Sequence, residues 1–243
     1  MTLTLVTALV DLGRSEIGGS FARGMSYYTD SLSRLMELPF PKVVYLDKQL
    51  VGQYQDAPAT HITLIDYSDL QDFLYYQRIQ EIRAAPNWYS QADWLPESPQ
   101  CRLPGYNPLV MSKMIWLNEL AQINPFRTEG AFWLDAGIYN NDQFAYYGDE
   151  SFIRQTIKRD FSYVQRSCHE TKEVHGFEIS AFRRYCDGGT DTIVPGGIFG
   201  GSMQALLALH GDYMRIMAET LSEGYMGTEE NLLTILAYQL DVM

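Results

Sequence analysis

Short apolar runs that alternate with longer amphipathic segments constrain the fold of this 243-residue chain more than any other feature. Residues 3–9, 43–46 and 61–65 are rich in aliphatic and β-branched side chains, and the run at 131–134 repeats the pattern later in the chain. Continuous runs of this length are typical of strands buried on both faces, as in a parallel sheet covered by helices. Strands and helices therefore alternate, which predicts an α/β domain with a mostly parallel central sheet flanked by helices.

The segments between these runs carry helical signals. From Phe21 to Met36 apolar residues recur at spacings of three and four, and Pro39 and Pro41 follow as a stop signal. By the same periodicity and capping signals we expect further helices over about 66–83, 108–123, 202–223 and 229–240.

The segment from Pro86 to Pro108 stands apart because it contains five prolines together with Trp88, Tyr89 and Trp94. A connection of this length is typical of an active-site loop or lid, and equally of an ordered surface excursion. In the first case Trp88 and Trp94 are candidates to stack on a ring of a bound ligand. The sequence does not decide between the two interpretations.

Charge and cysteine usage exclude several function classes. Eighteen basic residues against 30 acidic ones give a formal net charge of −12, which argues against generic binding to nucleic acid or to an anionic membrane surface. Any phosphate site must then be built locally, from a few cations, a metal ion or backbone N–H groups. The three cysteines lack C-x-x-C spacing, and no apolar run approaches the roughly 20 residues of a membrane helix. We expect reduced thiols and a cytoplasmic protein without a transmembrane segment, or one peripheral to a membrane.

Asp135 is the first candidate site residue, because it follows the apolar run at 131–134 directly. An acid at the carboxyl end of a buried parallel strand lies where α/β sheets bind their ligands. Such a carboxylate is a natural ligand for Mg²⁺ or Mn²⁺ that bridges phosphate oxygens. The alternative interpretation is that Asp135 only ends the strand and caps the next turn.

Two glycine pairs form the second candidate, at 196–197 and 200–201, separated by Ile198 and Phe199 and followed by Ser202. Glycine lets the backbone approach a ligand closely, and a helix that begins at Ser202 would offer free N–H groups to an anion or a sugar hydroxyl. The alternative interpretation is a tight turn that is required only for packing.

Adjacent carboxylates at Glu229 and Glu230 form the third candidate. In a catalytic interpretation, such a pair can supply one buried catalytic group and one exposed partner. In a structural interpretation, Thr228 caps a helix whose positive N-terminus favours two acids in its first turn. Cations near these motifs are Arg14 and Lys113, whereas the four histidines of the chain show no spacing typical of metal ligands.

The order of these parts resembles the bacterial HtrL/YibB-like family over almost the whole chain, a family that looks like glycosyltransferases of the GT-A fold. The resemblance implies a single GT-A-like, Rossmann-like domain over 1–243, with a nucleotide-binding half at 1–135 and a sugar and acceptor half at 136–243. The resembling segments are 5–14, 112–113, 124–126, 133–138 and 196–201.

The C-terminal third is similar, more distantly, to the retaining α-1,3-galactosyl and N-acetylgalactosaminyl transferases of the blood-group type. Those enzymes carry a comparable Gly-Gly-x-Phe-Gly-Gly-Ser turn, and an Asp-Glu pair opens their last helix. Matched on the leucine that follows, their catalytic Glu falls on Glu230 and their Asp on Glu229.

The resemblance implies a role for each site residue. Glu230, assisted by Glu229, is the catalytic candidate, and Asp135 is the metal candidate for Mn²⁺ or Mg²⁺. The nucleotide-diphosphate sugar would be held by Thr7, Ala8, Asp11, Arg14, Lys113, Asp135 and Gly137. The sugar and the acceptor would meet Gly196, Gly197, Phe199, Gly200, Gly201, Trp88 and Trp94.

One position departs from the pattern of those families, where the metal motif reads Asp-x-Asp. Here Gly137 stands in the place of the second acid. Asp142 is a candidate second ligand, by its closeness in sequence alone. The other option is a metal-independent site, in which Lys113 and Arg14 hold the diphosphate.

The leading hypothesis is a glycosyltransferase that moves a sugar from a UDP- or GDP-type donor to a glycan or a small acceptor, with retention of configuration. The rival hypothesis is a catalytically silent sugar-nucleotide or glycan-binding module of the same fold, which Gly137 favours. A nucleotidylyltransferase fits less well, since no long glycine-rich segment ending in basic residues follows the first strand. The acidity of the chain favours a neutral or small acceptor over a polyanion.

Overall fold

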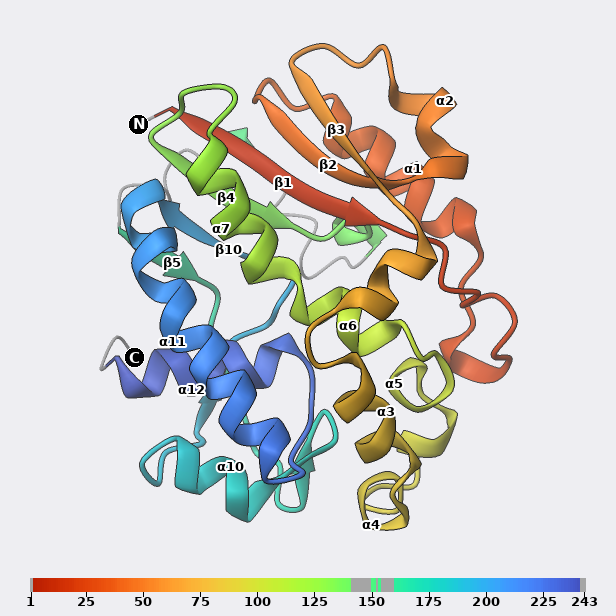
Figure 1. Cartoon of the computed structure of the whole chain (residues 1–243), viewed down its shortest axis with the longest axis vertical. Helices are drawn as coiled ribbons and strands as arrows, with labels where there is room; N and C mark the ends of the chain where they lie inside the picture. The colour runs from red at the N-terminus through yellow and green to blue at the C-terminus, as the bar shows by residue number, and fades with distance from the viewer. Residues whose placement is uncertain (1, 141–149, 152, 154–159, 241–243) are drawn as a thin grey trace.

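Six strands form one central sheet in the computed structural model, which describes residues 2–140, 150, 151, 153 and 160–240 (Figure 1). The strands lie in the order β3-β2-β1-β4-β10-β5. β1, β2, β3 and β4 run parallel, whereas β10 is antiparallel to both of its neighbours. Their bounds are β1 (Leu3–Leu9), β2 (Lys42–Asp47), β3 (Thr60–Ile65), β4 (Gly130–Leu134), β5 (Phe161–Tyr163) and β10 (Ile198–Ser202). The predicted α/β architecture with a mostly parallel central sheet is confirmed.

The strand order changes direction between β1 and β4. From β1 the chain continues outward to β2 and β3, and it then returns to place β4 on the other side of β1. Because both strands are parallel, their carboxyl ends meet at one edge of the sheet. In an open α/β sheet this is the point at which a crevice for a ligand forms.

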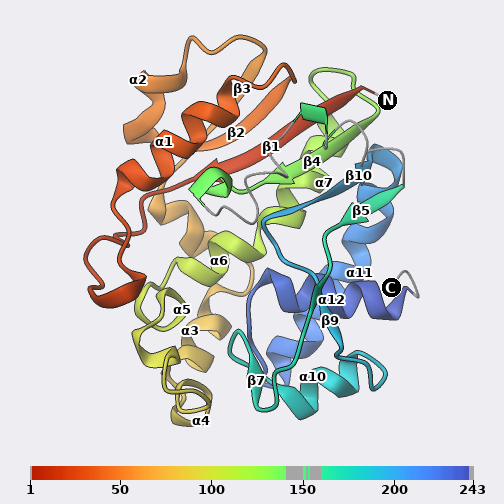
Figure 2. The ribbon, with the colours of Figure 1, turned by 180° about the vertical axis from the view of Figure 1, so that it is seen from behind.

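Helices cover both faces of the sheet, which explains the continuous apolar runs. α1 (Met25–Met36) packs on one face against Leu9, Val44 and Leu46. On the other face lie α7 (Lys113–Ile123) and α11 (Met203–Ser222), which pack on each other. Figures 1 and 2 show the two layers from opposite sides, with α7 and α11 in front in the first and α1 in front in the second.

The lower half of the molecule in Figure 1 is built from helices and two small hairpin-like sheets. These sheets pair β6 (Arg166–Ser167) with β9 (Thr192–Ile193) and β7 (Glu173–Val174) with β8 (Phe177–Glu178). The other elements are η1 (Gly19–Phe21), η2 (Lys48–Leu50), α2 (Val51–Tyr54), η3 (Tyr67–Asp72), α3 (Tyr76–Ala84), α4 (Pro86–Tyr89), η4 (Leu95–Glu97), α5 (Pro99–Arg102), α6 (Tyr106–Met111), η5 (Ile138–Asn140), α10 (Ile179–Tyr185) and α12 (Glu229–Gln239).

Three predicted helices begin or end elsewhere. α1 begins at Met25 and not at Phe21, because the short helix η1 ends at Phe21 and the backbone is extended at Ala22 (ψ 135°) and at Gly24 (ψ 159°). The helix predicted over 66–83 is divided into η3 and α3, and the one over 108–123 is divided into α6 and α7 at Ser112. Periodicity placed these segments correctly but did not show their breaks.

The second glycine pair lies in a strand and not in the predicted turn. A Cβ atom on Gly200 would lie 2.3 Å from the carbonyl oxygen of Ala131, and one on Gly201 would lie 1.9 Å from that of Asp160. Phe199 between the pairs is fully buried. The requirement for glycine here is therefore close packing of neighbouring backbones, which was the alternative interpretation.

The proline-rich segment is an ordered excursion of short helices. Trp88 is only 1% exposed, and its indole Nε1 donates to the carbonyl oxygen of Met226 at 2.8 Å. Trp94 donates from Nε1 to Oε1 of Glu173 at 3.0 Å. The prediction that Trp88 stacks on a sugar ring is wrong, because its ring faces are covered by the core.

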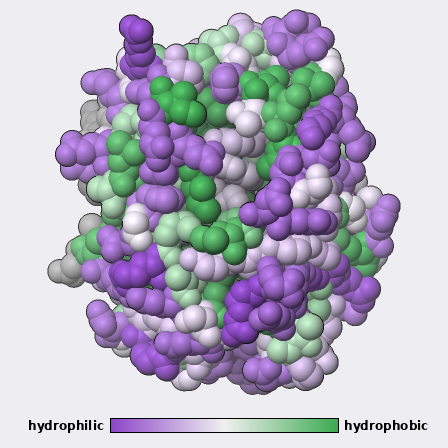
Figure 3. Space-filling view, viewed as in Figure 1, coloured by the Kyte–Doolittle hydropathy of each residue, from purple (hydrophilic) through white to green (hydrophobic). Residues whose placement is uncertain are grey.

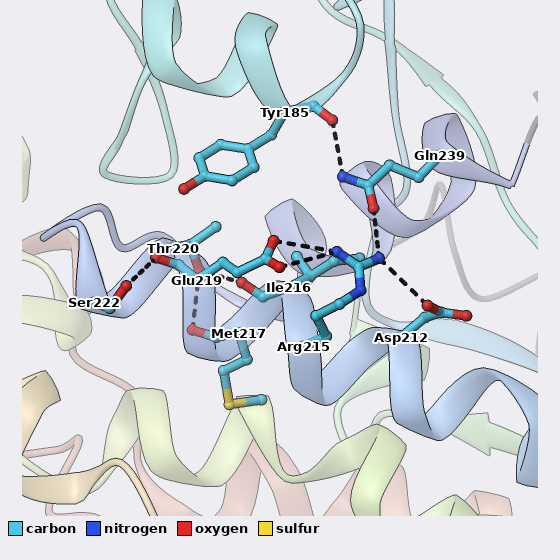
Figure 4. A network of polar contacts seen from close by, with 9 residues as sticks. All are labelled: Tyr185, Asp212, Arg215, Ile216, Met217, Glu219, Thr220, Ser222 and Gln239. Atoms are coloured by element: carbon cyan, nitrogen blue, oxygen red, sulfur yellow. Dashed lines mark hydrogen bonds and ion pairs between the residues drawn. The ribbon is translucent and has the colours of Figure 1, made fainter.

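Polar contacts tie the last two helices to α10 at the surface (Figure 4). Arg215 of α11 bonds Asp212 and Glu219 on its own helix and, at 3.0 Å from Nη2, the Oε1 of Gln239 in α12. Gln239 in turn donates from Nε2 to the carbonyl oxygen of Tyr185 at 3.3 Å. These groups are exposed, so the network orients the helices more than it stabilises them.

The face seen in Figure 3 is mostly hydrophilic, with apolar side chains in several separate groups. Large exposed apolar side chains are few, with Leu74 and Ile123 the most open. Among the residues that the structure describes, none of the helices is both long enough and apolar enough to cross a membrane. Cys101, Cys168 and Cys186 are free thiols, as their spacing predicts.

Candidate functional site

A cavity of about 380 Å³ lies where β1 and β4 end. Its lining comes from 8–12 at the end of β1, from 135–138 after β4, and from the first turns of the helical layer around Tyr106 and Lys113. Further walls come from the loop before α1 and from Glu230 at the start of α12. The cavity therefore occupies the ligand-binding position that strand order alone assigns to this sheet.

Eight of the predicted site residues line this cavity. They come from segments that are far apart in the sequence and that share only their position at this edge of the sheet. They are Ala8, Asp11, Arg14, Lys113, Asp135, Gly137, Gly197 and Glu230.

The remaining predicted site residues lie elsewhere. Thr7 is buried within β1, and Glu229 lies behind Lys113 with a side chain that is 6% exposed. Gly196 lies against Glu229, since a Cβ atom there would be 2.2 Å from its Oε1. Asp142 lies outside the described residues. The other five do not line the cavity, namely Phe199, Gly200, Gly201, Trp88 and Trp94.

Lys113 is the centre of a buried polar cluster beneath the cavity. Its Nζ lies 2.7 Å from Oδ1 of Asp135, 2.5 Å from Oε1 of Glu229 and 3.0 Å from the carbonyl oxygen of Gly196. An ammonium group has three N–H donors, and these three oxygens match them. Burial lowers the pKa of Lys113, but Asp135 and Glu229 outweigh it and raise the pKa, so the side chain stays charged. Lys113 therefore holds Asp135 in place and has no donor left for a ligand.

Asp135 keeps one carboxylate oxygen free. Its Oδ1 takes the Lys113 contact and also accepts from Nε1 of Trp133 at 2.7 Å. Its Oδ2 accepts no hydrogen bond from any residue in the described ranges. With a side chain that is 40% exposed, Asp135 presents this oxygen at the cavity.

The side chains described at the cavity do not by themselves complete a site for a divalent cation. Within the described parts of the chain, no three His, Cys, Asp or Glu side chains are grouped to hold a metal ion. Where a second acid would stand, a Cβ atom on Gly137 would meet the rings of Tyr28 and Tyr27 at 3.4 and 3.6 Å. The tyrosine rings border that position at ordinary van der Waals distance, and Asp135 offers a single free oxygen, whereas Mg²⁺ prefers six oxygens. Mn²⁺ or Mg²⁺ at Asp135 stays a prediction, in which the ligand itself would supply most of the coordination.

The two adjacent carboxylates have opposite environments. Burial raises the pKa of Glu229 to about 7, and the carboxylates of Glu230 and Asp135 act in the same direction against Lys113. For Glu230, burial also acts to raise the pKa, but the hydrogen bond and the charge of His175 outweigh it and lower the pKa. Near neutral pH Glu230 is ionised at the cavity while Glu229 titrates beneath it. Pairs of carboxylates separated in this way are typical of acid–base and nucleophilic sites.

Two arginines and two tyrosines form a further part of the cavity wall, and only Arg14 among them was predicted from the sequence. Arg14 donates from Nη1 to the hydroxyl of Tyr28 at 2.7 Å, and Arg23 donates from Nη1 to the carbonyl oxygen of Ser20 at 2.7 Å. Arg23 lies over the ring of Tyr27. A guanidinium has five N–H donors, so both arginines keep donors, Nη2 among them, that bond no described residue.

Two further residues at the site carry no functional signal in the sequence. Tyr28 lies within the apolar stripe over 21–36, and His175, which contacts Glu230 without lining the cavity, has no metal-ligand spacing. The signal available for Arg23 was its position in the loop that follows the first strand, close to Arg14.

A comparison with models of protein families assigns the chain to a family. The model of HtrL_YibB, described as a bacterial protein of unknown function, matches residues 1–241. The chain belongs to this family. A comparison with curated proteins finds no match. The predicted membership of the HtrL/YibB family is thus confirmed, and because this family carries no assigned activity, the function must be argued from the cavity.

Proposed function

We propose that this HtrL_YibB family member is a glycosyltransferase that uses a nucleotide-diphosphate sugar. One observation supports the proposal above all others. A cavity at the carboxyl ends of β1 and β4 is lined both by arginines with unused donors and by the ionised carboxylate of Glu230. Its size falls within the range of about 300–1,000 Å³ that small-molecule sites occupy.

In this proposal the diphosphate binds to the wall of Arg14 and Arg23. Lys113 has its three donors engaged, so the cations with donors to spare are these two arginines. Guanidinium groups bind phosphate oxygens in a bidentate manner, which suits a diphosphate. Tyr27, which is 36% exposed beside Arg23, offers a ring on which the nucleobase can stack. A local site of this kind explains how a chain of net charge −12 can bind a dianion.

The sugar then lies near Asp135, Gly197 and Glu230. A Cβ atom built on Gly137 would contact the tyrosine rings, whereas one on Gly197 would lie 3.7 Å from Oδ2 of Asp135, and the proposal places the sugar on the Gly197 side. Oδ2 of Asp135 would accept a hydrogen bond from a sugar hydroxyl. The space beside Glu230 would take an acceptor that is neutral or small.

The proposed reaction breaks the bond between the anomeric carbon and the diphosphate, and the electron pair leaves with the nucleoside diphosphate. As that carbon gains positive charge, the Glu230 carboxylate on its open face stabilises it or attacks it. The acceptor hydroxyl then forms the new bond to carbon and gives its proton to the departing diphosphate oxygen; if Glu230 has attacked, the bond between its oxygen and the carbon breaks in this step and the carboxylate is regenerated. This path retains configuration. In an inverting enzyme Glu230 would instead take the acceptor proton.

A thermal-shift panel of UDP, GDP and their sugar conjugates, with and without Mn²⁺, tests the proposal. A ligand that binds only the folded state at 100 times its Kd stabilises it by about 2.7 kcal/mol, which is a measurable rise in melting temperature. Turnover of the stabilising donor is expected to be lost in Glu230→Gln and to persist in Glu81→Gln, a matched change at an exposed side chain.

The outcomes separate the two hypotheses. The absence of a shift with every nucleotide would contradict the whole proposal. Tight binding without turnover on any acceptor would favour the silent binding module in its place.

A further inference from the structure

A histidine at the tip of a small hairpin contacts the proposed catalytic carboxylate. β7 and β8 are joined by His175 and Gly176, which take left-handed φ angles of 51° and 89°. Two consecutive left-handed residues make the tight turn that hairpins of this length use, and Asn-Gly is the pair that favours it most. Histidine is among the residues that tolerate a positive φ, so the turn permits His175 but does not require this side chain.

The hairpin is braced from two sides. The buried carboxylate of Glu173 accepts from Nε1 of Trp94 at 3.0 Å and from the N–H of Gly176 at 2.8 Å. From α12, Nδ2 of Asn231 donates to the carbonyl oxygen of Val174 at 3.0 Å. The proline-rich segment and α12 therefore hold the turn together, and this bracing gives Trp94 a structural role.

The imidazole of His175 is aimed at Glu230 by this bracing. Its Nε2 lies 2.9 Å from Oε2 of Glu230, and its side chain is 34% exposed. The N–H of Gly196 also bonds the Glu230 carboxylate. Glu229, the neighbouring acid, bonds Lys113 instead, so each carboxylate of the pair has a different basic partner.

We propose that His175 is the positioning residue of Glu230, and that the hairpin exists to hold its imidazole against Oε2 so that the carboxylate faces the cavity in one orientation. The proposal rests on the proposed function for its consequence in activity. The contact between the two side chains can be tested without it.

Several charged groups act on the imidazole. Burial lowers the pKa of His175, but its hydrogen bond to Glu230 and the charges of Glu230 and Glu229 outweigh it, and Arg166 on β6 opposes them. The net direction of the pKa is upward, so the imidazole keeps its charge beside Glu230 to a higher pH than a free histidine would. As pH rises through the pKa of His175, the imidazole loses its charge and its hold on the carboxylate weakens.

His175→Asn is the informative variant, because Asn-Gly is the pair that the turn favours and asparagine is too short to reach Glu230. The hairpin is thereby kept while the contact is removed. We expect kcat for the donor that stabilises the wild type to fall by about tenfold or more, the size that a charge-assisted hydrogen bond supports, with KM changed by less than about threefold.

His175→Gln is the rescue variant. Its side-chain amide can donate to Oε2 but does not titrate, so part of kcat returns and the fall of activity at alkaline pH disappears. His169→Asn, at an exposed loop position, is the matched control and leaves both unchanged. A merely structural role of His175 would not alter the pH profile in this way.

An NMR titration of His175 in wild type and in Glu230→Gln tests the contact without any substrate. We expect the pKa of His175 to fall in Glu230→Gln. An unmoved pKa would overturn the proposal, as would His175→Asn with wild-type kcat and an unchanged pH profile. If no nucleotide sugar is turned over but the pKa falls in Glu230→Gln, the contact stands and the proposed function fails.

Discussion

The pKa of Glu229 predicts how the stability of the protein changes with pH. Its carboxylate is buried against Lys113, and burial raises its pKa from 4.5 to about 7. In the unfolded chain the group loses its proton near 4.5, whereas in the folded protein it keeps the proton up to about 7. The folded state therefore binds more protons between these values, and stability falls as pH rises through that window.

The magnitude follows from the two pKa values. One pKa unit corresponds to about 1.4 kcal/mol, so integration between pH 5 and pH 8 gives a loss on the order of 2–3 kcal/mol from this group alone. Glu229→Gln removes the titration but keeps a side-chain oxygen for Lys113, which remains paired with Asp135. The variant should therefore gain stability of the same order relative to wild type as pH rises over this range.

Urea unfolding of both proteins at several pH values between 5 and 8 measures this difference directly. Subtraction of the two curves cancels groups that lie far from Glu229, whereas His175 and Glu230 cancel only in part because they interact with the charge of Glu229. Glu81→Gln, whose side chain is 51% exposed, should show a nearly constant difference from wild type. A difference for Glu229→Gln that is equally constant would refute the reasoning, because it would mean that Lys113 compensates the burial of the carboxylate in full.

Three further expectations follow from other parts of the molecule. Arg14→Gln and Arg23→Gln should each weaken binding of UDP or GDP by about tenfold or more while leaving the weak binding of the bare nucleoside unchanged, as calorimetry can show. Gly200→Ala should lower the free energy of unfolding by more than about 3 kcal/mol or prevent folding, because its Cβ would lie 2.3 Å from a backbone oxygen. The control is Gly211→Ala in α11, whose Cβ meets nothing within 4 Å and which should be neutral or stabilising in the same melting experiment. Arg215→Ala should cost under about 1 kcal/mol in urea unfolding, since its ion pairs are exposed, and a larger loss would show that the surface network bears more of the packing of α12 than exposure allows.

Local patterns were enough to predict the layers of the fold. The apolar runs at 3–9, 43–46 and 131–134 became β1, β2 and β4, because a strand that is buried on both faces must be apolar throughout. The same patterns placed Asp135 at the end of β4 and Glu230 in the first turn of α12, and both line the cavity. Each of these features depends on residues that are neighbours in the sequence.

Contacts between distant residues overturned or refined other predictions. The glycines at 200–201 resemble a ligand-binding turn until the closeness of Ala131 and Asp160 shows that they are required by the sheet. Trp88 lies in a proline-rich segment of a kind that often forms a lid, but its indole Nε1 donates to the carbonyl oxygen of Met226, which is 138 positions away along the chain. No local signal distinguishes a tryptophan that covers a ligand from one that fills the core.

The amino-acid sequence alone was sufficient for the alternation of strands and helices, the parallel sheet, the family and the acids at the ends of two elements, since periodicity and capping act within a few residues. The partners of those acids depended on how the chain folds back on itself. Lys113 and Glu229 are 116 positions apart, and His175 reaches Glu230 only because a hairpin and a helix start are packed together. Burial and the neighbours in space determine which acid is ionised, which cation is free for a ligand and which tryptophan is buried. Burial and these neighbours exist only in the folded tertiary structure.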